Sequence, residues 1–184
     1  MLIARSSLEA HLYMDLHPCE CGVADFARQH SLQQQGGAMV SVYEGVCAGC
    51  GRQRRFVFEM VDELPPPPPA FGGPEPSRII DPGQFFDVSN RISTRIGPLL
   101  LETPEGERRK HRPAVAYSLA AVEEVLKFFP DGQDRIPASA FTSELGKALY
   151  AKDPEDFSRD LIEFNIERKR RILAGIDRVS PPQP

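Results

Sequence analysis

The chain has 184 residues, a length that suits one domain of ordinary size or two small ones. Its composition, 41% hydrophobic and 26% charged, is typical of a globular protein and excludes wholesale disorder, a collagen-like fibre and a coiled coil. The net charge of −4, with no strongly basic region, gives no global attraction to nucleic acid or to a membrane surface.

The N-terminal residues predict a short helix over about residues 7–16. Ser6 and Glu9 have the spacing of a capping box at its start, and a strand over 11–16 is the alternative because the helical periodicity is weak. These first residues lack the cationic and apolar pattern of a secretory leader. No apolar run approaches the roughly 20 residues that span a bilayer, so we expect a cytoplasmic protein without a membrane segment.

Strands are predicted next. A strand is expected from about Val23 to His30, followed by a loop over 33–37. Two runs rich in β-branched and aromatic residues, 39–46 and 54–60, flank a tight segment that contains two cysteines. This pattern predicts a β-hairpin whose turn carries two thiols.

Proline divides the chain. Residues 65–77 begin with consecutive prolines and continue rich in Gly and Pro, which predicts an extended linker. We therefore expect a Cys-containing module over 1–64, the linker over 65–77, a helical module over 78–179 and a flexible tail over 180–184. An alternative role for the linker is that of a PxxP ligand for an aromatic groove.

The second module has helical periodicity. Asp81, Pro82 and Gln84 have the pattern of a helix start, and further helices are predicted over 115–129, over 141–149 and after Asp153. A polar loop is expected over 105–112. The apolar positions expected to form the inner face of the last helix are Phe157, Leu161, Phe164, Ile172 and Leu173. The predicted fold class is α+β, with a small antiparallel sheet followed by a helical module.

The four cysteines form two tight pairs separated by 25 intervening residues, Cys19 with Cys21 and Cys47 with Cys50. Thiols stay reduced in the cytosol, so two such pairs favour metal ligation over disulfide bonds. Strands that bring the pairs together would supply the four corners of a tetrahedral zinc site. A glycine follows each pair and permits the backbone conformation that lets amide groups approach the thiolates.

The pattern over about residues 17–60 resembles the zinc ribbon, in which two such knuckles clamp zinc at one end of a small antiparallel sheet. Cys47 and Cys50 match the Cys-x-x-Cys-Gly knuckle well, whereas the first pair is one residue short. We expect Cys19 to complete the site, with His17 as a substitute ligand or an outer-shell group. The layout of the whole chain resembles that of bacterial proteins, a likeness that implies no activity.

The four cysteines could instead be unrelated buried thiols or contain a redox-active pair. A redox pair is usually placed at the start of a helix after a strand, not in a hairpin turn. Four protein ligands leave no position for water or substrate, which favours structural zinc that supplies folding energy to a small module. Catalytic zinc is the alternative if only three side chains ligate.

Four arginines lie near the cysteines: Arg28, Arg52, Arg54 and Arg55. They are expected to offset the negative charge of zinc bound by four thiolates, and contact with nucleic-acid phosphates is the alternative. Two further basic runs, 108–112 and 168–171, are expected to be solvated faces, with contact to an anionic partner as the alternative.

The sequence contains no nucleophile elbow, no zinc-protease helix motif and no phosphate-binding glycine loop. No catalytic residue is therefore assigned. The sequence predicts a non-catalytic, zinc-stabilised binding or adaptor protein with a protein partner. The first alternative is a nucleic-acid-binding accessory protein that uses the four arginines, and the second is a metalloenzyme.

Overall fold

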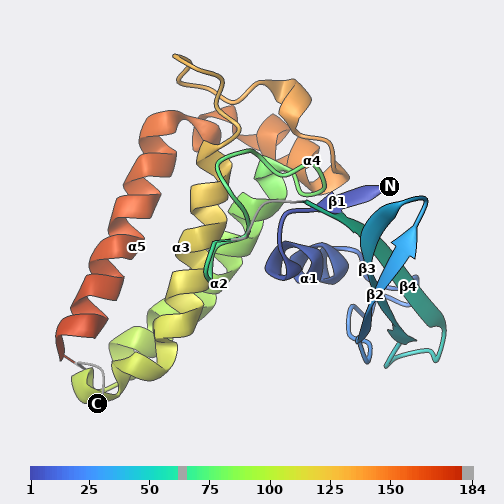
Figure 1. Ribbon diagram of the computed structural model, residues 1–184. Helices are drawn as coiled ribbons and strands as arrows, with labels where there is room; N and C mark the ends of the chain where they lie inside the picture. Colours follow the sequence, from blue (N-terminus) through green and yellow to red (C-terminus); the bar gives the residue numbers. More distant parts are fainter. Residues whose placement is uncertain (62–65, 180–184) are drawn as a thin grey trace. The chain divides into compact units, whose positions relative to one another are not determined.

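The computed structural model describes residues 1–61 and 66–179 (Figure 1). The described residues form a mixed sheet and five α-helices, which confirms the predicted α+β class. The chain divides into two compact units, Met1–Ile80 and Asp81–Pro184. The predicted tail over 180–184 lies outside the described residues, as does Pro65 of the predicted linker. None of the helices in the described ranges is both long and apolar enough to cross a lipid bilayer.

The first unit contains a four-stranded sheet with strand order β1-β4-β3-β2. Its strands are β1 (Leu2–Ala4), β2 (Gln29–Gln35), β3 (Ala38–Val46) and β4 (Gln53–Met60). Strands β3 and β4 form the predicted antiparallel hairpin, in which Tyr43 lies opposite Phe56. Strands β2, β3 and β4 pair antiparallel as expected, whereas β1 pairs parallel with β4, so the sheet is mixed and mostly antiparallel. A strand of three residues is too short to show an alternating pattern in the sequence.

The predicted strand over 23–30 is wrong in position, because strand β2 covers Gln29–Gln35 instead. Gly36 and Gly37 have φ angles of 59° and 89° and form the two-residue turn that leads directly into β3. No residue of β2 is buried, and β2 is an edge strand. The sequence does not reveal this strand, because no buried face imposes an alternating hydrophobic pattern on it.

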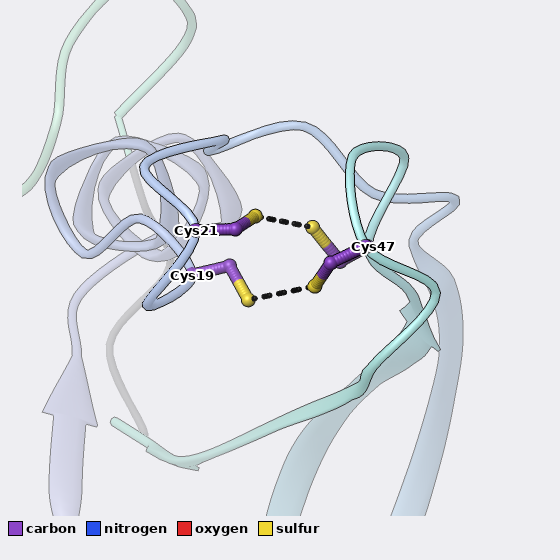
Figure 2. Close-up of side chains that lie close together, drawn as sticks. Cys19, Cys21 and Cys47 are labelled. Carbon is purple, nitrogen blue, oxygen red and sulfur yellow. Dashed lines mark hydrogen bonds between the residues drawn. The ribbon is translucent and has the colours of Figure 1, made fainter.

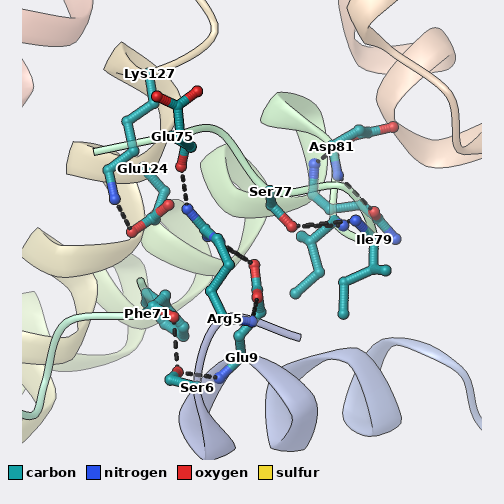
Figure 3. Close-up of polar contacts among 12 residues, drawn as sticks. Arg5, Ser6, Glu9, Phe71, Glu75, Ser77, Ile79, Asp81, Glu124 and Lys127 are labelled. Carbon is teal, nitrogen blue, oxygen red and sulfur yellow. Dashed lines mark hydrogen bonds and ion pairs between the residues drawn. The ribbon is translucent and has the colours of Figure 1, made fainter. Parts of the chain in front are cut away.

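Helix α1 (Ser7–Leu16) begins at the predicted cap, where Ser6 Oγ accepts a hydrogen bond from the Glu9 N–H at 3.1 Å. The Glu9 carboxylate does not close a capping box on Ser6. It accepts instead from the backbone N–H and the guanidinium of Arg5, each at 2.6 Å (Figure 3). The helix packs on the sheet through a buried core that consists of Ala4, Ala10, Met14, Phe26, Tyr43 and Phe58.

The described part of the predicted linker contacts the start of α1. Ser6 Oγ donates to the Phe71 carbonyl oxygen at 2.6 Å, and the Arg5 guanidinium donates to the Glu75 carbonyl oxygen (Figure 3). Phe71 itself is buried. These residues therefore form part of the first unit, while the boundaries of the modules stay a prediction.

The second unit is helical. Its helices are α2 (Pro82–Glu102), α3 (Arg112–Leu126), α4 (Glu144–Lys152) and α5 (Arg159–Val179), with short 3-10 helices at Glu105–His111, Ala138–Ala140 and Pro154–Phe157. The predicted cap of α2 is confirmed, because Asp81 Oδ1 accepts from the Gln84 N–H at 2.9 Å and the Gln84 side chain accepts from the Asp81 N–H at 3.0 Å. The segment expected as a polar loop is mostly the 3-10 helix Glu105–His111, which has no buried residue.

Helix α5 presents a different face to its neighbours than its sequence predicts. Its buried residues are Ile162, Ile166, Lys169 and Ile176. Of the positions expected on the inner face, Leu161, Phe164 and Ile172 are exposed. Apolar residues lie on more than one side of this helix, so the periodicity alone could not give its orientation.

Candidate metal centre

The structure brings the four cysteines together. Their Sγ atoms all lie within 4.8 Å of one another. The Sγ atoms of Cys19 and Cys50 are 3.6 Å apart, as are those of Cys21 and Cys47 (Figure 2). Tetrahedral zinc with Zn–S bonds of about 2.3 Å requires sulfurs about 3.8 Å apart. The four cysteines can therefore hold one four-coordinate metal ion.

The first cysteine pair lies in the loop after α1, which folds back on itself. The Cys19 N–H donates to the Val23 carbonyl oxygen at 2.9 Å, and the Gly22 N–H donates to the Cys19 carbonyl oxygen at 2.7 Å. Gly22 has a φ of 84°, a conformation that residues with a side chain rarely adopt. This tight turn accommodates the spacing that is one residue short of the usual knuckle.

The second pair lies in the connection between β3 and β4. The Cys47 N–H donates to the Arg52 carbonyl oxygen at 2.9 Å, and the Gly51 N–H donates to the Cys47 carbonyl oxygen at 3.0 Å. The N–H groups of Gly49 and Cys50 donate to the Cys47 sulfur. Gly51 has a φ of 72°. Both glycines that follow the pairs therefore adopt the conformation that their positions predict.

The two cysteine loops touch at Gly49. A Cβ atom at this position would lie 2.7 Å from Val23 and 3.3 Å from the Cys21 sulfur. The neighbouring Ala48 N–H donates to the Asp25 carbonyl oxygen at 3.1 Å. A side chain at Gly49 would force the loops apart, so the glycine permits the close approach of the two thiol pairs.

The cysteine thiols have unequal acidities. The pKa of Cys47 is lowered to about 6, because the backbone N–H groups of Cys50 and Gly49 donate to its sulfur. The backbone N–H of Arg52 lowers the pKa of Cys50, but the nearby thiols, that of Cys19 foremost, outweigh this effect and raise it to about 11. The sulfurs therefore cannot all be thiolates at neutral pH without a cation, and metal binding would release the remaining protons.

His17, the alternative ligand, lies beside α1. Its Nδ1 is 2.7 Å from the Tyr13 carbonyl oxygen, and its ring stacks on that of Tyr13 at 3.9 Å between centroids. Within the described ranges, the group of side chains able to hold a metal consists of cysteines alone and includes Cys19.

Arg54 is buried and holds the first cysteine loop in place. Its guanidinium donates to the carbonyl oxygen of Ala24 at 2.9 Å and to that of His17. The same group lies over the rings of Phe26 and Phe56, at 4.8 and 4.9 Å from their centroids. The sequence does not predict this positioning role, because it depends on carbonyl groups that carry no sequence signal.

The other three arginines singled out in the sequence have acidic partners. Arg52 pairs with Glu20, which lies between Cys19 and Cys21, so this pair joins the two cysteine loops. Two pairs lie elsewhere in the first unit, Arg28 with Asp15 and Arg55 with Glu44. A role for these arginines in contacting nucleic acid stays a prediction.

The site can be compared with those of known proteins. No protein-family model, curated protein or solved structure matches the chain. The geometry of the four sulfurs is therefore the evidence for the function of this site, and that geometry is one that could hold a metal ion.

Proposed function

We propose that the four cysteines bind one structural zinc ion, and that the protein is a non-catalytic binding or adaptor protein with a protein partner. The observation that carries the zinc site is the convergence of four Sγ atoms within 4.8 Å, from two loops that are 25 residues apart in the sequence. Thiolate ligands in a tetrahedral arrangement favour zinc among the common divalent ions.

The proposed role of the zinc is structural. Four sulfurs fill the tetrahedron and leave no position for water or substrate. The first unit spans only Met1–Ile80. A domain of this size gains little from burial alone, so the bound ion would contribute much of its folding free energy.

The proposed protein partner is supported by apolar side chains on α5. Leu161, Phe164 and Ile172 are exposed, and 63% of Phe164 is accessible to solvent. Large apolar side chains that gather on one helix typically contact another protein. The partners found for the four arginines within the first unit favour this function over nucleic-acid binding.

Metal analysis of the purified protein tests the zinc site. We expect one zinc per chain and an X-ray absorption spectrum with four sulfur ligands and no nitrogen. Cys50→Ala should lose the metal and unfold the first unit, while the helices of the second unit retain their circular dichroism. His17→Ala is the matched control and should keep one zinc. Full zinc content in Cys50→Ala, or a nitrogen ligand, would contradict the proposal.

Affinity capture tests the partner. We expect the wild-type chain to capture a partner protein and Phe164→Glu to fail to capture it, because a charge in the apolar patch opposes burial. Lys147→Glu is the control, since Lys147 lies on the exposed side of α4 beside Glu144. Equal capture by both variants, or capture of no protein, would count against an adaptor role.

A further inference from the structure

Lys169 occupies a core position of α5. It follows the helical repeat of the buried residues Ile162, Ile166 and Ile176, and only 2% of it is exposed. Its Nζ atom is buried and has no hydrogen-bond partner among the described residues. A buried charged group without a partner is costly, and proteins usually retain one only where it has a use.

The amine remains largely charged at neutral pH. Burial lowers the pKa of Lys169 to about 8, and the nearby charge of Arg168 acts in the same direction. A pKa near 8 still leaves the group mostly protonated at pH 7. The second unit therefore contains an uncompensated positive charge next to its apolar core.

Lys169 forms part of the wall of a cavity of about 240 Å³ between α2, α3 and α5. Within the part of the chain that the structure describes, no acidic residue lines this cavity. Most of the wall is apolar, and it includes Ile92, Ile96, Leu100, Val115 and Ile172.

The polar part of the wall consists of Lys169, Arg168 and two serine hydroxyls, those of Ser93 and Ser118. Their Oγ atoms lie 3.1 Å apart, and each lies 2.9 Å from the carbonyl oxygen of Ser89, to which it donates. Neither serine can neutralise the ammonium group. An anion that enters the cavity would therefore find two cationic side chains, Lys169 and Arg168, and a mostly apolar lining.

We propose that this cavity binds a short-chain monocarboxylic acid, with its carboxylate on Lys169 Nζ and its apolar chain among the side chains of α2, α3 and α5. Its volume of about 240 Å³ leaves room for a short apolar chain, and hexanoate serves as the probe. Lys169 Nζ is itself buried, so binding requires its flexible four-carbon stem to rotate and bring the ammonium group to the cavity.

Isothermal titration of the full-length protein with hexanoate and with 1-hexanol tests this site. We expect one hexanoate per chain, bound at least about tenfold more tightly than the uncharged alcohol, because the ammonium pairs only with the acid. Lys169→Met keeps the length of the side chain and should weaken this preference, and the double variant that also carries Arg168→Met should abolish it. Arg171→Met removes a charge from the exposed side of the same helix, where Arg171 pairs with Glu167 at 2.9 Å, and should keep it.

The proposal is overturned if hexanoate binds no more tightly than hexanol, if neither binds, or if Lys169→Met keeps the preference for hexanoate undiminished. Nuclear magnetic resonance of the Lys169 side chain provides a second measurement that needs no variant. Its Cε signal should shift with hexanoate and not with hexanol, and an unchanged signal would also overturn the proposal. Both measurements are independent of the metal site and of the partner.

Discussion

The guanidinium group of Arg54 donates a hydrogen bond to the backbone carbonyl oxygen of His17. A second donor of the same side chain reaches the Ala24 carbonyl oxygen at 2.9 Å. These two carbonyls lie on either side of the loop that carries Cys19 and Cys21. One side chain from β4 thus holds both ends of the first cysteine loop near the second.

Replacing Arg54 should weaken both the fold of the first unit and its hold on metal. Arg54→Met leaves two carbonyl oxygens without their donors, and we expect the free energy of unfolding of the zinc-loaded protein to fall by about 2–4 kcal/mol. Transfer of zinc to a chelator should be faster in the same variant. Arg55→Met removes an exposed pair with Glu44 and should cost less than about 1 kcal/mol. An equal decrease in the free energy of unfolding in Arg54→Met and Arg55→Met would show that Arg54 does not hold the cysteine loop.

Gly45 on β3 allows a close approach of the chain before β2. A Cβ atom at this position would lie 1.9 Å from the Ala27 carbonyl oxygen. Gly45→Ala should therefore destabilise the protein by about 1–3 kcal/mol in urea denaturation. Gly175→Ala on α5 meets nothing within 4 Å and should stabilise by about 0.5–1 kcal/mol, because alanine favours the helix. A change in the free energy of unfolding of the same sign for both substitutions would refute this explanation.

Asp81 connects the start of α2 to the start of α4. Its Oδ2 atom accepts from the N–H groups of Thr142 and Ser143 at 3.0 and 2.7 Å, while Oδ1 caps α2. Asp81→Ala leaves three N–H groups unpaired and should lower the free energy of unfolding of the second unit by about 2–4 kcal/mol.

The control for Asp81 is Ser143→Ala, which removes one helix cap, the bond from the Gly146 N–H at 2.9 Å. Loss of a single cap should cost about 1 kcal/mol. Urea denaturation followed by far-ultraviolet circular dichroism measures both variants. An Asp81→Ala loss no larger than that of Ser143→Ala would contradict the connecting role.

Lys169 should make the stability of the second unit depend on pH in the alkaline range. Its pKa is lowered from 10.5 to about 8 in the folded state, mainly by burial. Between these values the unfolded chain binds more protons than the folded one, so the free energy of unfolding should rise with pH. Below about pH 8 both states are protonated and the dependence disappears.

The measurement for Lys169 compares the wild type with Lys169→Met, without added acid. The variant lacks the buried charge and should be the more stable protein near pH 8. The difference should narrow as the pH rises toward 10.5, because other titrating groups are common to both chains. A constant difference across this range would argue against a buried, uncompensated ammonium group.

The elements that the sequence predicts correctly have local signals. The cap residues Ser6 and Asp81 mark their helices within a single turn, and strands β3 and β4 are rich in β-branched and aromatic residues around a tight connection. Strands β1 and β2 lack such signals, because one is very short and the other has no buried residue. Their positions in the sheet depend on pairing with strands rather than on a local pattern in their own sequence.

The metal site likewise combines features with a local sequence signal and features that depend on the folded chain. The spacing of Cys47 and Cys50 and the glycines after both pairs are local features, and they suffice to indicate two knuckles. Arg54 is expected from the sequence only as a source of charge, since its partners are backbone carbonyls brought close by folding. Lys169 lies in a basic run that is expected to be solvated, and only the orientation of α5 shows that it is buried.

The clustering of the cysteines has a practical consequence. The chain has four cysteines, and all of them belong to the group beside Gly49. Maleimide alkylation therefore reports on this cluster alone. Chains that hold their ion should resist the reagent, and chains that have lost it should acquire up to four adducts, so an intact-mass spectrum would reveal the occupancy of individual molecules.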